Sequence, residues 1–146
     1  MKKLFSVNHQ SFQIDISLLI VRIAIAAMML THGLPKFAQF FNEGPVQFIG
    51  VFGMSASFSL ALTVFAEVLC SVLILMGLGT RLATIPLIIT MLVAVLYIHG
   101  SDPFVKQEMG LHYLLVYVLL FLTGSGKYSM DYFYHKKALA LSLNKK

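Results

Sequence analysis

Charged residues are scarce in this chain of 146 residues, and their scarcity excludes a soluble domain. They make up 12% of the sequence, whereas a soluble globular domain has about 25%. Hydrophobic residues make up 58%, and such an excess must face something other than water. The length allows one domain, residues 1–146. The composition therefore indicates a single integral membrane domain.

Cysteine is almost absent as well. The one cysteine, Cys70, lies inside a long apolar stretch. A disulfide within the chain and a Cys-x-x-Cys relay are therefore excluded. Free cysteines are usually buried and behave as small hydrophobic residues, so we expect Cys70 to be a small residue at a helix contact.

Four segments are apolar enough to cross a bilayer, which takes roughly 20 residues per helix. They cover residues 16–34, 58–78, 82–98 and 106–123. The predicted fold class is all-α: a polytopic membrane protein with four transmembrane helices in an antiparallel bundle. We expect Pro35 to end or kink the first helix.

The segment between the first two spans is too interrupted by glycine and proline to cross a membrane. Pro45 suits the first position of a helix, and Val46, Phe48, Ile49 and Phe52 could form an apolar stripe. Residues 45–53 are therefore predicted to form a short interfacial or re-entrant element that covers the mouth of the bundle.

The basic residues predict the orientation of the bundle. Eight of the 11 lysines and arginines lie on the side of the two termini and the loop around Arg81, against two, Lys36 and Lys106, on the other side. Basic flanks stay in the cytoplasm, so both termini are predicted to be cytoplasmic. The net charge of +5 thus reflects topology and contact with the lipid surface, and we expect no nucleic-acid partner.

A carboxylate stands in the middle of the second span, at Glu67 in TVFAEVLCSVLILMG. A charge at the centre of a membrane helix costs about 3 kcal/mol, which 12 Leu, Ile, Val and Phe residues of this span offset at roughly 0.3–0.6 kcal/mol each. Thr63, Glu67 and Ser71 are four residues apart and share one helix face. Glu67 is therefore expected to face the interior of the bundle.

The heights of the side chains suggest a partner for Glu67. At 1.5 Å per residue, Arg22 lies roughly 8 Å, Glu67 roughly 16 Å and His32 roughly 22 Å above the cytoplasmic boundary. Side chains lean toward the N-terminus of their own helix, which brings His32 toward Glu67 and moves Arg22 away. We therefore predict a Glu67–His32 pair. Arg22 is predicted to be a structural intramembrane charge that reaches the cytoplasmic headgroups or the cytoplasmic ends of neighbouring helices.

Two more histidines fall in the outer half, where His99 ends the third span and His112 opens the fourth. One interpretation is that they are interfacial residues that donate to carbonyl groups. Another is a polar pocket for a ligand such as a quinone headgroup. Its candidate residues are His32, Lys36, Glu67, His99 and His112.

Other cofactors have little support in the sequence. No His-x-x-x-His or carboxylate–histidine spacing indicates a metal site, and there is no haem or iron–sulfur ligand set. GSGKYS resembles a phosphate loop only superficially, because Tyr128 follows Lys127 and no strand precedes it. No metal, haem or nucleotide is therefore expected.

Several pieces of the sequence, in their order and spacing, resemble the DoxX family of small four-helix membrane proteins. The similarity spans about residues 18–131. The pieces are Arg22 followed by THGLPKF, Glu67 with LILMGLGTRLA, Met91 in the third span, and GSGKYSMD after the fourth.

The resemblance implies a multi-pass bundle in the bacterial cytoplasmic (inner) membrane and a link to redox chemistry. Relatives are described as membrane subunits of thiosulfate–quinone oxidoreduction, or as partners of thiol and superoxide-detoxifying enzymes. Many relatives have a glutamate that opens the fourth span, a position that falls here to Glu108 or His112. This is an analogy between folds, and function depends on the site itself.

Three functions follow as hypotheses. The first is a redox-linked membrane subunit that binds a quinone or assists thiol or thiosulfate oxidoreduction, and that exchanges electrons with a partner enzyme. The second is a non-catalytic membrane scaffold or assembly factor. A small-solute transporter is a weaker alternative, because no pair of broken-helix repeats is evident. Homo-oligomers are compatible with all three.

Overall fold

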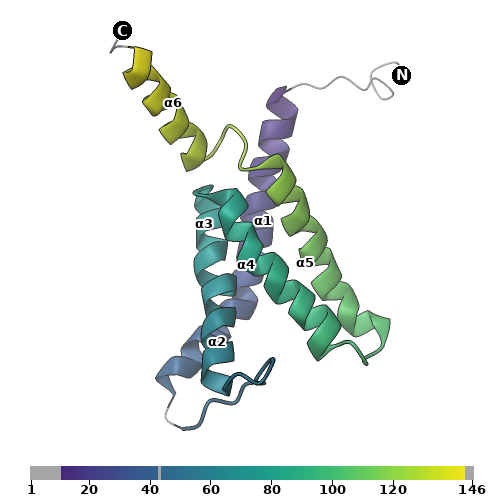
Figure 1. Cartoon of the computed structure of the whole chain (residues 1–146). Helices are drawn as coiled ribbons and strands as arrows, with labels where there is room; N and C mark the ends of the chain where they lie inside the picture. The colour runs from purple at the N-terminus through teal and green to yellow at the C-terminus, as the bar shows by residue number, and fades with distance from the viewer. Residues whose placement is uncertain (1–10, 43, 144–146) are drawn as a thin grey trace, which may run out of the picture.

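The computed structural model describes residues 11–42 and 44–143, and every regular element in these ranges is helical (Figure 1). The all-α prediction is therefore confirmed for the described part of the chain. The elements are α1 (Ser11–Ala38), η2 (Gln39–Phe41), α2 (Ala56–Val64), η3 (Phe65–Cys70), α3 (Ser71–Met76), α4 (Thr80–Val93), η4 (Ala94–Ile98), α5 (Phe104–Thr123) and α6 (Met130–Leu143).

These elements join into four continuous helices that are long and apolar enough to cross a membrane, as predicted. They cover Phe12–Phe41, Ala56–Met76, Thr80–Ile98 and Phe104–Thr123. The first helix is longer than expected at both ends. Pro35 lies inside α1, so of the two expectations, that it ends or that it kinks the helix, the first was wrong. Proline removes one backbone hydrogen bond, to the carbonyl four residues earlier, and the helix continues for another turn before η2.

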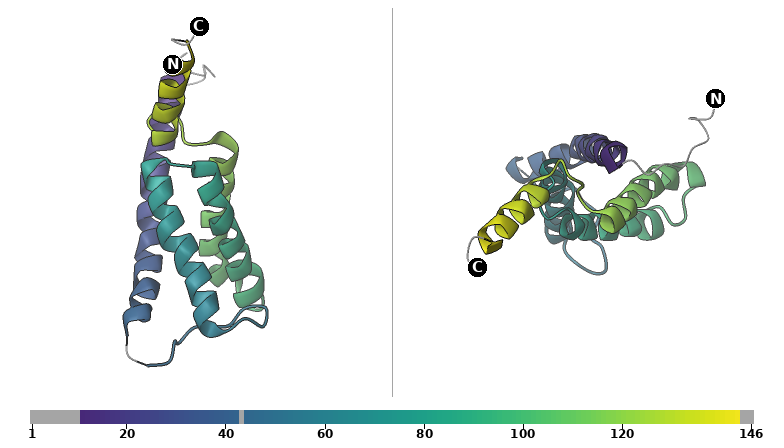
Figure 2. Two further views of the ribbon diagram at one scale, coloured as in Figure 1. Left: turned by 60° about the vertical axis from the view of Figure 1, so that its left-hand side comes forward. Right: turned by 90° about the horizontal axis from the view of Figure 1, so that it is seen from above.

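Both ends of the described chain lie at one end of the bundle, here called the proximal end (Figures 1 and 2). The proximal end also holds the turn at residues 77–79 and the loop at residues 124–129. The opposite, distal end holds residues 44–55 and the turn at residues 99–103. Helix α6 leaves the bundle at the proximal end and points away from it (Figure 1).

The interior is built from small and apolar side chains of all four spans. The core contains Ile25, Ala26 and Met29 of the first span, Ala66, Cys70 and Ile74 of the second, Ala83, Leu87 and Met91 of the third, and Tyr113, Tyr117 and Leu120 of the fourth. Cys70 is 2% exposed and free, which fits the small contact residue predicted. Large apolar side chains such as Ile20, Leu82 and Leu122 point outward, where lipid replaces water.

Two spans contain a short π-helix that the sequence did not predict. Residues Phe65–Cys70 form η3 in the second span, and Ala94–Ile98 form η4 in the third. A π-helix bonds each N–H to the carbonyl five residues earlier, and such insertions are rare and frequent at functional sites. Here η3 carries Glu67, and η4 is followed directly by His99.

The segment before α2 lies at the distal end, as predicted, but it is not a helix. Residues 45–50 have no regular secondary structure, and a turn follows at Phe52 and Gly53. The Val51 N–H donates to the Ser59 hydroxyl at 3.1 Å, which fastens the segment to α2. Gly53 has a φ of 77°, a left-handed conformation that ends any helix. The helical interpretation of Pro45 was therefore wrong.

Candidate functional site

Glu67 forms an ion pair with Lys36 inside the bundle. The Lys36 Nζ atom lies 2.5 Å from Glu67 Oε1 and 2.7 Å from Oε2. The Glu67 side chain is 4% exposed and that of Lys36 is 30% exposed. A buried carboxylate needs a partner of this kind, because an unpaired charge in the membrane is costly.

The prediction that Glu67 pairs with His32 was wrong. Because α1 continues past Pro35, Lys36 stays on the helix, one turn after His32 and on the same face. Its long side chain leans toward the N-terminus of α1 and so extends into the bundle. The His32 ring instead meets the Tyr113 ring edge-on, with centroids 5.8 Å apart.

Gly33 allows α1 to approach η3 closely enough for this pair to form. A Cβ atom at Gly33 would lie 2.9 Å from Val68 Cγ2, 3.0 Å from Glu67 Cβ and 3.1 Å from the Glu67 backbone carbon. Side chains at membrane helix contacts are often small for this reason. Gly33 therefore sets the distance between the helix of Lys36 and that of Glu67.

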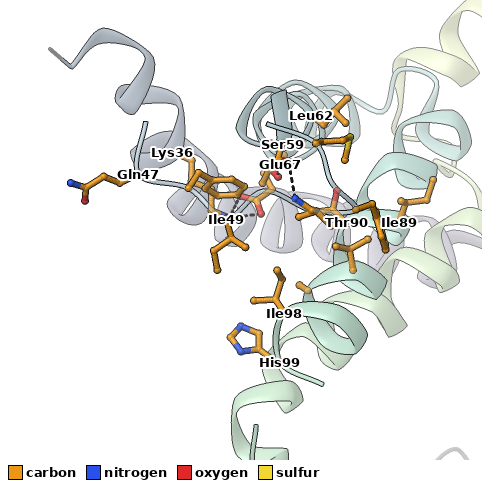
Figure 3. Close-up of a pocket in the computed structure, with 17 residues that line it drawn as sticks. Lys36, Gln47, Ile49, Ser59, Leu62, Glu67, Ile89, Thr90, Ile98 and His99 are labelled. Atoms are coloured by element: carbon orange, nitrogen blue, oxygen red, sulfur yellow. Dashed lines mark hydrogen bonds and ion pairs between the residues drawn. The ribbon is translucent and has the colours of Figure 1, made fainter. Parts of the chain in front are cut away.

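The ion pair borders a cavity of about 550 Å³ in the distal half of the bundle (Figure 3). The segment at residues 47–54, the second span and the third span form its walls. Its apolar lining residues are Phe48, Ile49, Val51, Phe52, Met54, Leu62, Ile89, Val93, Ala94 and Ile98, and its polar ones are Lys36, Gln47, Ser59, Thr63, Glu67, Thr90 and His99. A volume of this size is typical of small-molecule sites.

The hydroxyl groups of this cavity are oriented by the helices that carry them. Thr63 donates to the Ser59 carbonyl at 2.9 Å, and Thr90 donates to the Pro86 carbonyl at 2.8 Å. The hydroxyl protons of Thr63 and Thr90 are therefore used in these hydrogen bonds, and the lone pairs of the two oxygens remain as acceptors. The cavity thus offers an ammonium donor at Lys36 and several oxygen acceptors to a polar ligand.

His99 stands at the distal wall of the cavity, opposite the ion pair (Figure 3). Its Nδ1 atom lies 2.8 Å from Asp102 Oδ2. The hydrogen bond with His99, aided by Lys106 at 3.6 Å, holds the pKa of the Asp102 carboxyl below its ordinary value. With Asp102 ionised, Nδ1 carries the proton of the neutral ring, and Nε2 is then the acceptor.

His32 and His112 do not belong to this cavity, although the sequence predicted one pocket for all the candidate residues. Both line a second cavity of about 450 Å³, together with Tyr113 and Thr31. This second cavity lies between α1 and α5, whereas the first lies between the second and third spans. The structure therefore brings together Lys36, Glu67 and His99.

The position that opens the fourth span has no role in the Glu67 cavity. Glu108 is exposed, and neither Glu108 nor His112 lines that cavity. Within the described residues, no group of three or more His, Cys, Asp or Glu side chains is placed to hold a metal ion.

Arg22 reaches the proximal ends of neighbouring helices, as predicted. It is 1% exposed and donates to the carbonyls of Ile74 at 3.0 Å, Leu75 at 3.2 Å, Ser125 at 2.5 Å and Tyr128 at 3.0 Å. The first two carbonyls lie in the last turn of the second span, where backbone acceptors need partners from outside the helix, and the Ile74 carbonyl also accepts from the Gly77 N–H at 3.0 Å. GSGKYS therefore supplies carbonyl acceptors for Arg22.

Asp131 is a structural residue that the sequence analysis missed. Its carboxylate accepts from the backbone N–H groups of Gly79 at 2.7 Å and Thr80 at 3.2 Å, so it caps α4 from a distance of about 50 residues in sequence. The clue was the position of Asp131 at the end of GSGKYSMD, but only the folded chain shows its target.

Comparisons with known proteins identify the family. The DoxX family profile matches residues 17–100, more than half of the chain. The putative oxidoreductase CatD of Bacillus subtilis is 31% identical over 123 residues, which cover 84% of this chain and 90% of that protein. The uncharacterized membrane protein Rv3486 of Mycobacterium tuberculosis is 29% identical over 138 residues, with 85% of each chain covered.

An uncharacterized protein of Haemophilus influenzae is also similar, at 31% identity over 124 residues, 80% of this chain and 90% of that protein. No solved structure matches significantly. The family profile covers Arg22, Lys36 and Glu67, so both residues of the ion pair lie within the matched region. This chain belongs to the DoxX family of membrane proteins.

Proposed function

We propose that this protein is a redox-linked membrane subunit that binds a quinone-class molecule in the distal cavity. One observation carries the proposal: the buried Lys36–Glu67 ion pair forms part of the wall of an otherwise mainly apolar cavity of about 550 Å³. Apolar sites with a few convergent polar groups are the usual form of small-molecule sites.

The groups around the cavity suit a ring that carries carbonyl or hydroxyl oxygens. The Lys36 ammonium has three N–H donors, and one of them could bind a ligand carbonyl while Glu67 retains another. Glu67 and Thr90 accept from a ligand hydroxyl, and His99 offers a further nitrogen on the opposite wall. The apolar side chains of Phe48 and Ile98 would pack against the ring.

A redox role needs a partner protein in this proposal. The name of the Bacillus subtilis relative describes it as a putative oxidoreductase, and this supports the redox link. The sequence has one cysteine, Cys70, which is buried. We therefore assign the second electron carrier, which exchanges electrons with the bound quinone or quinol, to a partner enzyme at the membrane surface. The orientation with both termini in the cytoplasm is part of the same proposal.

The alternative is a membrane scaffold in which the polar residues only hold the helices together. The ion pair joins the first span to the second, and Arg22 joins three segments at the proximal end. Both features would serve a protein with no ligand.

A binding titration separates the two functions. Purified protein in nanodiscs is titrated with a short-chain quinone and its quinol, for the parent, the double variant Lys36→Met/Glu67→Leu and the control His32→Leu. The proposal expects the double variant to fold and lose affinity, because no charged donor or acceptor remains at that wall. His32→Leu should keep the parent affinity, because His32 lines a different cavity. Absence of binding to the folded parent would favour the scaffold.

A further inference from the structure

A third cavity, of about 370 Å³, lies at the proximal end. It is separate from the Glu67 cavity and from the second cavity, which His32 and His112 line. Three segments meet there: the start of α4, the end of α5 and the first turn of α6. Its lining residues are Gly79, Thr80, Arg81, Leu82, Thr123, Gly124, Ser125, Gly126, Asp131, Tyr132 and His135.

Thr80 brings a buried hydroxyl to this cavity. The residue is 0% exposed, and its Oγ1 atom has no hydrogen-bond partner among the described residues. A buried hydroxyl without a partner lowers stability, and such groups are few in folded proteins. The hydroxyl lies just behind the surface of the cavity, so a small shift of the lining side chains would let an acceptor bound there give Thr80 its missing hydrogen bond.

Arg81 brings a fixed positive charge to the same cavity. Its Nη2 atom donates to the Leu122 carbonyl at 3.2 Å. The side chain lies against Gly124, where a Cβ atom would be 3.3 Å from Arg81 Nε. A guanidinium has five N–H groups in a planar fork that suits phosphate oxygens. The described contacts use one of these groups, so an anion could accept from others.

Asp131 is the one acidic residue in the lining, and it limits which anion fits. Both of its oxygens accept from α4, at Gly79 and Thr80. Its negative charge would repel a small free anion of high charge. A headgroup that carries one phosphodiester charge together with hydroxyl groups would place its hydroxyls near this carboxylate and near His135.

Exposed apolar side chains lie at the cavity and beside it: Leu82 is a lining residue, and Leu122 directly precedes the lining residue Thr123. Leu82 of α4 is 75% exposed and Leu122 of α5 is 65% exposed. One turn farther into the membrane, Ile85 and Leu119 are also exposed, at 41% and 50%. A polar cavity at the end of the spans, followed by an apolar track along two helices, has the shape of a phospholipid site.

We infer that the proximal cavity binds an anionic phospholipid of the phosphatidylglycerol type. The phosphodiester accepts from the Arg81 guanidinium and the Thr80 hydroxyl, and the glycerol hydroxyls donate to Asp131. The acyl chains lie along the exposed leucines of α4 and α5. The same phosphate chemistry could come from a free anion, and the test distinguishes the two sources.

The test measures thermal unfolding of the full chain in nanodiscs of phosphatidylcholine, with and without phosphatidylglycerol. Phosphatidylglycerol should raise the Tm of the parent by several degrees, because a ligand that binds the folded state stabilises it. Arg81→Gln should lose most of this rise. Lys106→Gln, a distal surface variant of equal charge change, should keep it.

Thr80→Val gives a second and sharper readout. In phosphatidylcholine this variant should be as stable as the parent or more stable, because an unpartnered buried hydroxyl is removed. With phosphatidylglycerol it should gain less than the parent does. The control Ser71→Ala removes another buried hydroxyl, at a residue that does not line this cavity, and should gain as much as the parent.

Two results would overturn the inference. An equal rise of Tm with phosphatidylglycerol in the parent, Arg81→Gln and Thr80→Val would show that the lipid does not bind in this cavity. An equal rise from inorganic phosphate or glycerol 3-phosphate in pure phosphatidylcholine would show that the cavity is a site for free anions. Neither result depends on quinone binding in the distal cavity.

Discussion

Breaking the Lys36–Glu67 ion pair should have an asymmetric effect on stability. Lys36→Met leaves the Glu67 carboxylate, whose side chain is 4% exposed, buried without a partner. Removal of one partner of a buried ion pair typically costs about 3–5 kcal/mol. The Lys36 side chain is 30% exposed, which screens part of the interaction, so we expect a loss of about 3 kcal/mol.

The opposite change should be milder. Glu67→Gln leaves Lys36 without its carboxylate, but a lysine near the end of a membrane helix can extend its ammonium to the interface. An amide of nearly the same size also remains to accept a hydrogen bond. We expect a loss of about 1 kcal/mol. Lys36→Met/Glu67→Leu should be less destabilised than the sum of its single changes, because it leaves no orphan charge.

Unfolding of the variants in mixed detergent micelles, with helicity as the signal, measures these free energies. Polar couplings between membrane helices average about 0.6 kcal/mol and reach about 1.7 kcal/mol, and a charged pair with two short hydrogen bonds should lie near the upper value. A larger loss for Glu67→Gln than for Lys36→Met would refute the asymmetry. Strictly additive changes would refute the pair itself.

Four further changes test other parts of the structure. Gly33→Ala should destabilise the protein by about 1–3 kcal/mol in the same unfolding assay, because its Cβ atom would meet the Glu67 backbone. Arg22→Lys should lose about 3 kcal/mol there, because an ammonium cannot serve four separate carbonyls. The pKa of Asp102 is lowered in the folded protein, so its ionised carboxylate stabilises the distal turn. This contribution is complete above the ordinary pKa of about 3.9. It is lost as the pH falls through the lower pKa of the folded state. Hydrogen exchange of residues 99–107 below about pH 4 should show this loss, and Asp102→Asn should abolish it. A reporter active only outside the cytoplasm should be silent when fused after Lys146 and active when inserted at residue 100.

The helices could be predicted well from the sequence because a membrane imposes a simple rule. About 20 apolar residues are needed per span, and the four long runs of this chain satisfy it. The same reasoning placed Glu67 inside the bundle from the spacing of Thr63 and Ser71, and placed Arg22 at the ends of the helices. These predictions used periodicity and height, which depend on one helix at a time.

The partner of Glu67 could not be predicted in the same way, because it depends on where a helix ends. Pro35 was taken as the limit of the first span, which left Lys36 outside the bundle. One lost hydrogen bond did not break a helix supported by packing on both sides. The extra turn carries Lys36, and its long side chain then reaches a level that was assigned to His32.

The division of the histidines into two cavities was also beyond the sequence. Height along the membrane places His32, His99 and His112 in one layer, but it says nothing about direction around the bundle. The two π-helices add a second difficulty, because each shifts the helix face that follows it and no residue pattern announced them. The segment at residues 45–53, here called the covering segment, was predicted wrongly for a related reason. The apolar residues after Pro45 suit a helix, but Gly50 and Gly53 favour a turn.

The proximal end of the bundle is held by hydrogen bonds between the spans, whereas the distal end contains the cavity. This difference explains why the family motifs predict the fold better than the ligand. At the proximal end, Arg22 and Asp131 connect the first, second and third spans to the loop after the fourth. With their proximal ends joined, the second and third spans can separate toward the distal end, where the cavity lies between them (Figure 1). GLGTR and GSGKYSMD belong to the joined end, and they fix the bundle whatever the cavity holds. In the proposed function, ligand choice depends instead on Lys36, Glu67, the covering segment and the residues around His99, so variation in the covering segment should change the ligand while the bundle stays the same.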